Sequence, residues 1–271
     1  MSKHTSDFQD PQSPVFFETQ DRITHVYFNR PERLNPFDLE MSERFAKLIK
    51  VLHKEKSDVV ILTGKGRAFS AGADLKFLEA CTEEKEAKVR KALKKLYENF
   101  LTVRELKQVS IAQVNGAVAG GGLGLVWACD LRTVLASAKF AFNFVKIGLS
   151  PGMGILHMTG KILGEAKARE LWLRGRTELG AKVAEWGGAC EVAESPADLE
   201  RITLALAKEI RGNSKLGMEY IKKEMLWKDE LEEYLEFNCK HQAKCLKSPE
   251  AREGLRAIQE RRTPEFISLR D

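Results

Sequence analysis

The stretch FSAGADLK, residues 69–76, follows the wholly apolar run VVILT at 59–63 and leads into a segment with helical periodicity. A short run of aliphatic and β-branched residues is typical of a strand that is buried on both faces. Small residues in the following turn leave backbone N–H groups open to a ligand, because no bulky side chain covers them. The stretch therefore predicts a buried strand, a ligand-accessible turn and a helix.

A second glycine-rich turn, NGAVAGGG at 115–122, repeats this arrangement after a second expected buried strand at 109–114 and opens a helix that ends near Ala128. The first turn of a helix presents unpaired N–H groups and the positive end of the helix dipole. Two such turns on neighbouring strands can direct N–H groups at one oxygen, as in an oxyanion hole. Each turn alone fits tight packing of a helix on a strand equally well, and neither matches the nucleotide motifs GxGxxG and GxxxxGK[ST].

Short strands at 23–28 and 131–135 continue the alternation of strands with helices, which predicts an α/β core with a parallel sheet. One helix begins at Asp38 as the N-cap, and another is expected over 83–106. From 196 onward the chain has helical patterns only, at 197–211, 214–227, 230–246 and 249–261. We therefore expect an α/β core over 1–195, with a flexible polar tail at 1–12, and a helical region over 196–271.

Composition places the chain among ordinary globular proteins, with 271 residues, 43% hydrophobic and 31% charged. No apolar run approaches the ~18 residues that span a bilayer, and the polar N-terminus resembles no targeting signal. Five cysteines without a CxxC pair argue against a disulfide framework, so we expect a cytoplasmic location. Cys239, His241 and Cys245 lack the fourth ligand of a structural zinc site, and we predict no metal.

The formal net charge of +5 suits an anionic ligand. This mild basic excess is also the single feature of the chain that supports RNA binding. The basic residues are scattered among acidic ones, and no recognition motif accompanies them, so a nucleic-acid partner is not expected.

Taken together and in order, four motifs resemble those of the crotonase superfamily, which contains the enoyl-CoA hydratases and isomerases. They are NRPERLN at 29–35, FSAGADL at 69–75, Asn115-Gly116 with the triple glycine at 120–122, and Cys129-Asp130. The resemblance runs from about Thr24 to the helical C-terminus. It implies a ClpP/crotonase-like spiral of ββα units, an α-helical C-terminal trimerisation region, and a homotrimer or a dimer of trimers.

The same resemblance implies a site. Ala73 and Gly121 would donate the two backbone hydrogen bonds to a thioester oxygen, and the substrate would be an acyl-CoA or another acyl-thioester. Coenzyme A would enter as part of the substrate, with no separate cofactor. Arg33 and Leu34 would lie near its adenine end. The remaining substrate-binding residues implied are Ala71, Asp74, Leu75, Lys76, Gly120 and Phe144.

The chain departs from the family pattern at the acidic positions. Hydratases of the family place glutamates at the positions of Gly124 and Phe144, and some isomerases place an acid at that of Gly152. Hydration needs proton transfer, and each missing acid–base role costs about 10²–10⁴-fold in rate. We therefore predict weak or absent enoyl-CoA hydratase activity. Six side chains are candidate replacements for the missing acids, namely Glu79, Glu83, Tyr97, Asn143, Ser150 and His157.

The stretch at 140–154 resembles decarboxylases of polyketide pathways, which also lack both glutamates. Decarboxylation depends mainly on stabilising an enolate, so it tolerates their absence better. Three activities stay open: a lyase or isomerase of the enoyl-CoA hydratase/isomerase type, a decarboxylase of an acyl-thioester, and an inactive paralogue that only binds acyl-CoA. The acyl chain, and the choice between coenzyme A and a carrier protein, also stay open.

Overall fold

Two sheets form the centre of the protein, whose computed structural model describes residues 7–227 and 231–266. The larger sheet has the order β1-β2-β3-β5-β7-β10, with β1 and β2 antiparallel and the other neighbours parallel. Its strands are β1 (Val15–Gln20), β2 (Ile23–Phe28), β3 (Val59–Gly64), β5 (Val109–Val114), β7 (Leu131–Leu135) and β10 (Glu191–Ala193). The smaller sheet has β4 (Ala68–Ser70), β6 (Ala117–Ala119), β8 (Lys139–Ala141) and β9 (Thr177–Leu179), in that order.

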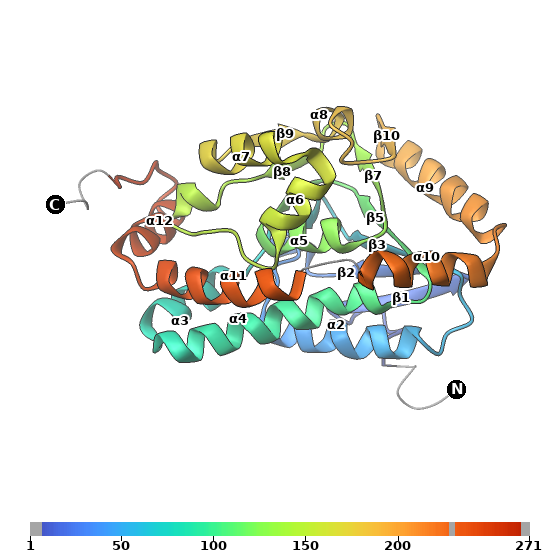
Figure 1. Ribbon diagram of the computed structural model, residues 1–271, viewed down its shortest axis with the longest axis horizontal. Coiled ribbons are helices and arrows are strands. Elements are labelled where there is room, and N and C mark those ends of the chain that lie inside the picture. The colour runs from blue at the N-terminus through green and yellow to red at the C-terminus, as the bar shows by residue number, and fades with distance from the viewer. Residues whose placement is uncertain (1–6, 228–230, 267–271) are drawn as a thin grey trace.

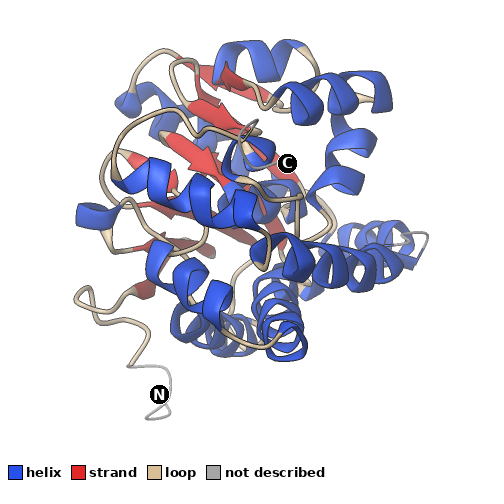
Figure 2. Cartoon of the chain, turned by 90° about the vertical axis from the view of Figure 1, so that its left-hand side faces the viewer, coloured by secondary structure: helices blue, strands red, loops and turns tan. Residues whose placement is uncertain are grey.

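Three times the chain passes from the larger sheet to the smaller one and then into a helix. The units are β3-β4-α3, β5-β6-α5 and β7-β8-α6, with α3 at Leu75–Glu83, α5 at Gly120–Ala128 and α6 at Ile155–Leu163. Figures 1 and 2 show the strands with helices on both sides. This arrangement confirms the predicted α/β fold with its spiral of ββα units.

The other helices cover the two sheets and each other (Figure 1). They are α2 (Leu39–Leu52), α4 (Glu86–Leu101), α7 (Glu165–Arg174), α8 (Gly180–Glu185), α9 (Pro196–Arg211), α10 (Lys215–Trp227), α11 (Leu231–Leu246) and α12 (Pro249–Gln259). Short 3₁₀ turns lie at η1 (Pro31–Arg33), η2 (Thr102–Glu105) and η3 (Phe144–Ile147). No helix in the described part of the chain has the length and apolar character needed to cross a bilayer.

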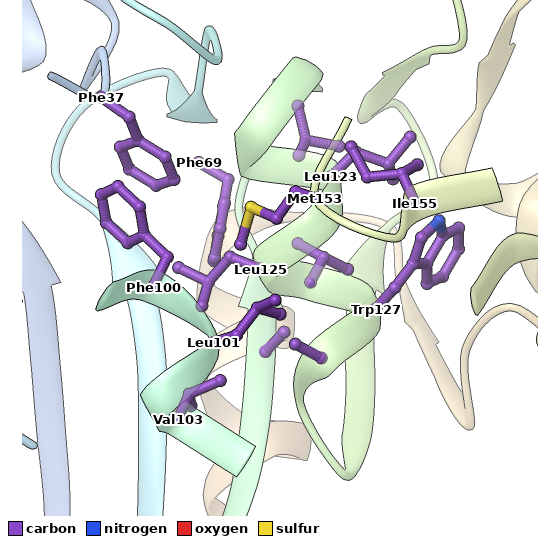
Figure 3. Close-up of a cluster of buried hydrophobic side chains, with 14 of the residues drawn as sticks. Phe37, Phe69, Phe100, Leu101, Val103, Leu123, Leu125, Trp127, Met153 and Ile155 are labelled. Atoms are coloured by element: carbon purple, nitrogen blue, oxygen red, sulfur yellow. The ribbon is translucent and has the colours of Figure 1, made fainter. Parts of the chain in front are cut away.

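Helix α5 lies in the middle of the hydrophobic core. Residues from Gly122 to Ala128 are all buried, as expected for a helix that is apolar on every side. Around it pack Phe37, Phe100, Met153 and Ile155, each at most 1% exposed (Figure 3). The N-terminus of this central helix is therefore held rigidly, and it faces the candidate site.

A helix within the range expected at 83–106 is confirmed, but its predicted bounds are wrong. The chain instead forms α3 up to Glu83, an extended link at Glu84 and Lys85, and then α4 and η2. Lys247, from the end of α11, donates hydrogen bonds to the carbonyls of Thr82 and Glu84. These bonds satisfy carbonyls where α3 ends, through a tertiary contact that no local pattern indicates.

The tail expected at 1–12 is also partly wrong, because Phe8 is only 5% exposed and its carbonyl accepts a hydrogen bond from the Phe17 amide at 2.8 Å. Residues 1–6 lie outside the described part. Strand β1, which receives this contact, is an element that the expected pattern of strands does not include.

Helices α9 to α12 confirm the expected helical C-terminal region within the described residues, while the predicted helix start at Glu230 lies outside them. Ala207 and Ile210 of α9 pack against Ile61 and Ile111 of the larger sheet, and α11 lies alongside α4 (Figure 1). The proposed domain boundary at 195 stays a prediction.

Candidate active site

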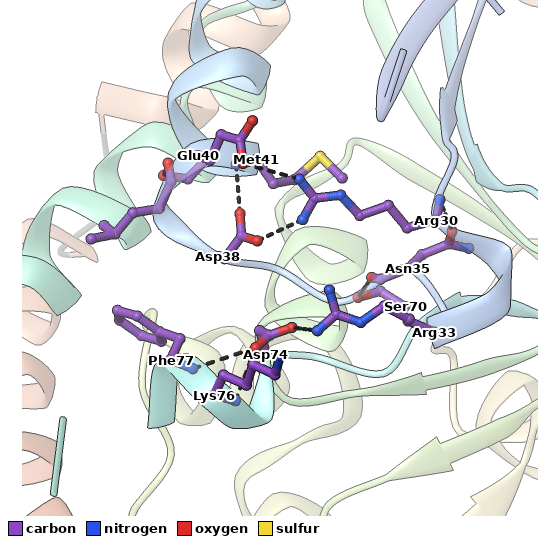
Figure 4. Close-up of polar contacts among 12 residues, drawn as sticks. Arg30, Arg33, Asn35, Asp38, Glu40, Met41, Ser70, Asp74, Lys76 and Phe77 are labelled. Atoms are coloured by element: carbon purple, nitrogen blue, oxygen red, sulfur yellow. Dashed lines mark hydrogen bonds and ion pairs between the residues drawn. The ribbon is translucent and has the colours of Figure 1, made fainter. Parts of the chain in front are cut away.

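The loop between β2 and α2 sets the position of the site, and Asn35 holds this loop. Asn35 is fully buried, has a left-handed backbone (φ 54°), and donates its side-chain amide to the carbonyls of Lys65 and Ala68 at 3.0 and 2.8 Å. Ser70 adds a hydrogen bond from its hydroxyl to the Asn35 carbonyl at 2.7 Å (Figure 4). The loop is therefore fixed against the first glycine-rich turn.

Phe37, at the end of this loop, orients the backbone of Ala73. The Phe37 amide donates to the Gly72 carbonyl at 2.7 Å, and its carbonyl accepts from the Asp74 amide at 2.9 Å. In a parallel bridge of this kind, the residue between the two bonded groups turns its own N–H to the opposite side. The Ala73 N–H therefore points away from Phe37, and it has no acceptor among the described residues.

The N-terminus of α5 approaches Ala73 closely. Gly72 has φ 88°, and a Cβ placed on it would lie 2.8 Å from the Ala119 carbonyl oxygen. A Cβ placed on Gly120 would lie 3.7 Å from the Ala73 nitrogen. Gly121 is the second residue of α5, where an N–H has no acceptor within the helix. The two turns thus lie against each other, and both Ala73 and Gly121 line one cavity.

Both turns line one cavity whose walls are mostly apolar. Leu93, Leu96, Leu149, Met153, Ile155 and Ile258 contribute aliphatic surface. The polar side chains among its described lining residues are Tyr97, Asn143 and Gln242, and of these Tyr97 alone is ionisable. An apolar cavity with a few polar groups and two backbone donors is typical of a small-molecule site.

The space beside Gly124 is filled by hydrocarbon and sulfur. A Cβ on Gly124 would lie 3.0 Å from both Ile155 Cγ1 and Met153 Sδ, closer than normal contact allows (Figure 3). The second position, Phe144, is 8% exposed, lines the cavity and packs on Trp172 with ring centroids 5.8 Å apart. Apolar groups therefore occupy the wall at both positions where the resemblance implies the glutamates of hydratases.

At the third position, Gly152, a polar pair from two other helices takes the space. A Cβ there would overlap the Tyr97 hydroxyl oxygen and lie 2.6 Å from Gln242 Oε1. Tyr97 donates its hydroxyl hydrogen to Gln242 Oε1, and Gln242 Nε2 donates to the Ser150 carbonyl at 2.7 Å. Burial raises the pKa of the Tyr97 hydroxyl well above its ordinary value, so this group is a neutral phenol.

The structure separates the site residues expected from the sequence into two groups. Ala71, Ala73, Leu75, Gly120, Gly121 and Phe144 line the cavity. Arg33, Leu34, Asp74 and Lys76 lie outside its lining. Figure 4 shows Arg33 beside Asp74 and Lys76 at the first turn. There Arg33 forms an ion pair with Asp74, whose carboxylate caps α3 by accepting from the Lys76 amide at 2.9 Å.

Of the six candidate replacements for the acids, Tyr97 and Asn143 reach the cavity. His157 stacks on Tyr234 with ring centroids 4.2 Å apart, outside the lining. Glu79 bonds to Gln259 and Glu83 lies 3.8 Å from Arg252. Ser150 contributes its carbonyl to Gln242, while its own buried hydroxyl has no partner among the described residues.

Sequence reasoning missed Gln242, Met153 and Ile155, which complete the cavity wall from helix α11 and from the segment before and at the start of α6. The Pro-Gly-Met-Gly run at 151–154 was one available signal, because Met153 has φ 57° and such a backbone marks a special position. No three His, Cys, Asp or Glu side chains converge as a metal site within the described ranges.

Comparisons with known proteins show the family of this chain. A family model described as enoyl-CoA hydratase/isomerase matches residues 18–268. A peroxisomal Delta(3,5)-Delta(2,4)-dienoyl-CoA isomerase of Arabidopsis thaliana is 27% identical over 93% of this chain and 95% of its own length. A trans-2-decenoyl-[acyl-carrier-protein] isomerase of Streptococcus mutans is 25% identical over 93% and 97%.

Among solved structures, an enoyl-CoA hydratase from Bacillus halodurans superposes with a TM-score of 0.84 and 27% identity, over 90% of this chain and all of that one. The fold and site therefore define an enzyme of the crotonase type. The chain belongs to the enoyl-CoA hydratase/isomerase family.

Proposed function

We propose that this protein binds an acyl-CoA thioester and stabilises its enolate through the N–H groups of Ala73 and Gly121. The observation that carries this proposal is the bridge between Phe37 and Ala73. It turns the Ala73 N–H away from the loop that contains Phe37, and Ala73 itself lies beside the N-terminus of α5. Two fixed donors and the helix dipole favour negative charge on an oxygen placed between them.

Coenzyme A would extend from the cavity over the first turn. Ala71 and Leu75 line the cavity and are exposed, and Asp74 and Lys76 continue along the same turn. Arg33, 47% exposed at its side chain, and Leu34 adjoin this surface and would face the adenine end. A carrier protein is the alternative source of the thioester, because one relative is named for an acyl-carrier-protein substrate.

The reaction belongs to the lyase and isomerase chemistry of this family, with the enolate as its intermediate. Met153 and Ile155 fill the space beside Gly124, which disfavours classical hydration. The cavity favours a reaction whose main requirement is stabilisation of an enolate. An inactive paralogue would bind acyl-CoA without turning over enoyl, dienoyl or carboxylated substrates, and turnover assays separate that alternative.

Acetoacetyl-CoA tests the proposal without knowledge of the natural substrate. An oxyanion hole stabilises its enolate, which has its own near-ultraviolet absorption band, so the band should appear when the thioester binds. Gly121→Pro removes one N–H at a position where the first helical turn tolerates proline. Its enolate band should be lost.

Gly121→Ala is the matched control, since a Cβ there would lie 3.5 Å from Phe37 Cδ2, an ordinary contact, and the N–H remains. Its band should persist. Equal bands in both variants, or no band in the natural protein, would contradict the proposal. Thermal unfolding of both variants checks that each is folded.

We also infer a homotrimer or a dimer of trimers. Helix α10 exposes four large apolar side chains, Leu216, Tyr220, Ile221 and Met225, each 61–70% exposed. Exposed apolar patches of this kind mark association surfaces. Sedimentation of the purified protein tests the inference, and a monomer at micromolar concentration would contradict it.

A further inference from the structure

Tyr97 is the one ionisable side chain among the described residues that line the cavity. It comes from α4, and its hydrogen-bond partner Gln242 comes from α11, which lies alongside (Figure 1). Gln242 Nε2 is held by the Ser150 carbonyl at 2.7 Å, so its Oε1 faces the tyrosine hydroxyl. The phenol is therefore positioned by Gln242, which is itself fixed by Ser150.

The hydroxyl of Tyr97 lies where an acidic side chain at position 152 would begin. A Cβ on Gly152 would overlap this oxygen, so a side chain at 152 and the Tyr97–Gln242 pair exclude one another. The position that is acidic in some isomerases of the family is thus supplied with a protic group by α4 instead.

A neutral phenol can give a proton but is a poor acceptor of one. Because burial keeps the proton on Tyr97, the described lining residues offer an acid but no base to remove a C–H proton. The enolate must then arise by breaking another bond at the α-carbon. Loss of carbon dioxide from an α-carboxylate is such a route, and the apolar wall of Met153 and Ile155 favours a neutral product over a carboxylate.

We propose that Tyr97 is the proton donor in the decarboxylation of an α-carboxylated acyl thioester, a proposal that rests on the proposed oxyanion hole. The bond between the α-carbon and the carboxylate breaks, and its electron pair forms the thioester enolate as carbon dioxide leaves. The Tyr97 hydroxyl then turns its hydrogen from Gln242 Oε1 toward the cavity, and this proton passes to the α-carbon. Solvent water returns a proton to the phenolate, so one proton is consumed per carbon dioxide released.

The test uses the full-length protein with malonyl-CoA and methylmalonyl-CoA in D₂O. The natural protein should release carbon dioxide and place deuterium on one face of the α-carbon of propionyl-CoA. Tyr97→Phe should lower the rate by about 10²–10⁴-fold and distribute deuterium over both faces, because bulk water then supplies the proton. Tyr234→Phe, which loses a hydroxyl outside the cavity lining, should change neither result.

The double variant Tyr97→Phe/Gln242→Leu removes both polar partners. It serves as a second test of the inference if Tyr97→Phe alone folds poorly. It should show the same loss of rate and of facial selectivity. The acetoacetyl-CoA band, measured on the same preparations, should persist in all of them.

Two results would overturn the inference while leaving the proposed function intact. One is an enolate band without release of carbon dioxide from either carboxylated thioester. The other is an unchanged rate with deuterium on one face in the Tyr97→Phe and double variants. Absence of the enolate band in the natural protein would instead remove the proposed function itself.

Discussion

On one side of the cavity, the N–H groups of Ala73 and Gly121 belong to main chain that is fixed by a bridge and a helix start. On the other side, the positions Gly124, Phe144 and Gly152 carry no acid, and side chains from elsewhere fill the space. In the proposed function, the first side would stabilise charge with backbone N–H groups, whereas the second would transfer protons with side chains. The comparison teaches that backbone hydrogen-bond donors can be kept while the side chains that transfer protons are replaced.

The reason lies in what each side requires of the sequence. The backbone side needs small residues that allow close approach, such as Gly72, where a Cβ would meet the Ala119 carbonyl. The side-chain side needs an ionisable group at a given point, which several helices can supply. A single substitution removes a carboxylate, but moving a backbone donor requires displacing a strand or a helix.

The largest expected effect concerns hydration. Because Gly124 and Phe144 stand where the resemblance implies the water-activating and carbon-protonating carboxylates, crotonyl-CoA should be hydrated slower than by family hydratases by about 10²–10⁴-fold for each role. Loss of the enoyl absorption measures this rate. Hydration at the usual rate would contradict this prediction, because it would show that a reactive water molecule can still bind beside Met153 and Ile155.

The companion variant Gly124→Glu should not restore hydration by itself. Its side chain would begin 3.0 Å from Met153 Sδ and Ile155 Cγ1, and a carboxylate in that apolar space is unfavourable. A gain of more than about tenfold in the rate of crotonyl-CoA hydration would contradict this expectation, even though one acid–base group contributes more than that. Such a gain would show that Met153 and Ile155 move easily to admit the carboxylate.

The next prediction concerns the backbone donors of Ala73 and Gly121. Gly72→Ala should lower enolate stabilisation by about 10²–10³-fold, or about 2.7–4 kcal/mol, the cost of losing one oxyanion donor. The added Cβ would lie 2.8 Å from the Ala119 oxygen at a backbone with φ 88°, so the two turns must move apart. The acetoacetyl-CoA band measures the loss.

Gly160→Ala is the control for that variant, because its Cβ would meet Glu165 Cγ at 3.8 Å within helix α6. The band should remain, and the free energy of unfolding should rise by about 1 kcal/mol. A normal band in Gly72→Ala would mean that the spacing of the turns does not matter.

A smaller effect concerns stability on the side-chain side. Tyr97→Phe leaves the buried Gln242 Oε1 without its donor and should lower the free energy of unfolding by about 1–3 kcal/mol. Tyr97→Phe/Gln242→Leu should cost less than the sum of the two single variants, since the unpaired oxygen is gone. Urea unfolding measures all three, and strict additivity would show that the pair is not coupled.

Sequence patterns were sufficient for the elements whose signals are local. The buried strand at 59–63 has a nearly unbroken apolar run, and the one at 109–114 is mostly apolar. Asp38 caps α2 as predicted, with its carboxylate accepting from the Met41 amide at 2.7 Å. Motif order was sufficient to place Ala73 and Gly121 in one cavity. Each of these features depends on residues that are close in sequence or on a resemblance.

Contacts between distant segments could not be predicted in the same way. Tyr97 and Gln242 are 145 residues apart, and their pairing depends on α4 lying beside α11. The end of α3 likewise depends on Lys247. The wall beside Gly124 depends on a left-handed Met153 that directs the chain back across α5. Tertiary packing determines these features, and a local sequence pattern does not indicate how distant segments pack.

The smallest expected effect is a rate that does not change with pH. Tyr97 acts as an acid, so its active form is the protonated one, and activity would fall as pH rises through its pKa. Burial raises that pKa well above the ordinary tyrosine value of about 10. The decarboxylation rate should therefore be level from about pH 6 to 9, in contrast to a carboxylic acid donor, whose rate falls across this range as the acid ionises. A decline of the decarboxylation rate centred within that range would contradict this expectation. It would show that the proton comes from another group, an ordinary acid that ionises in this range, and not from Tyr97.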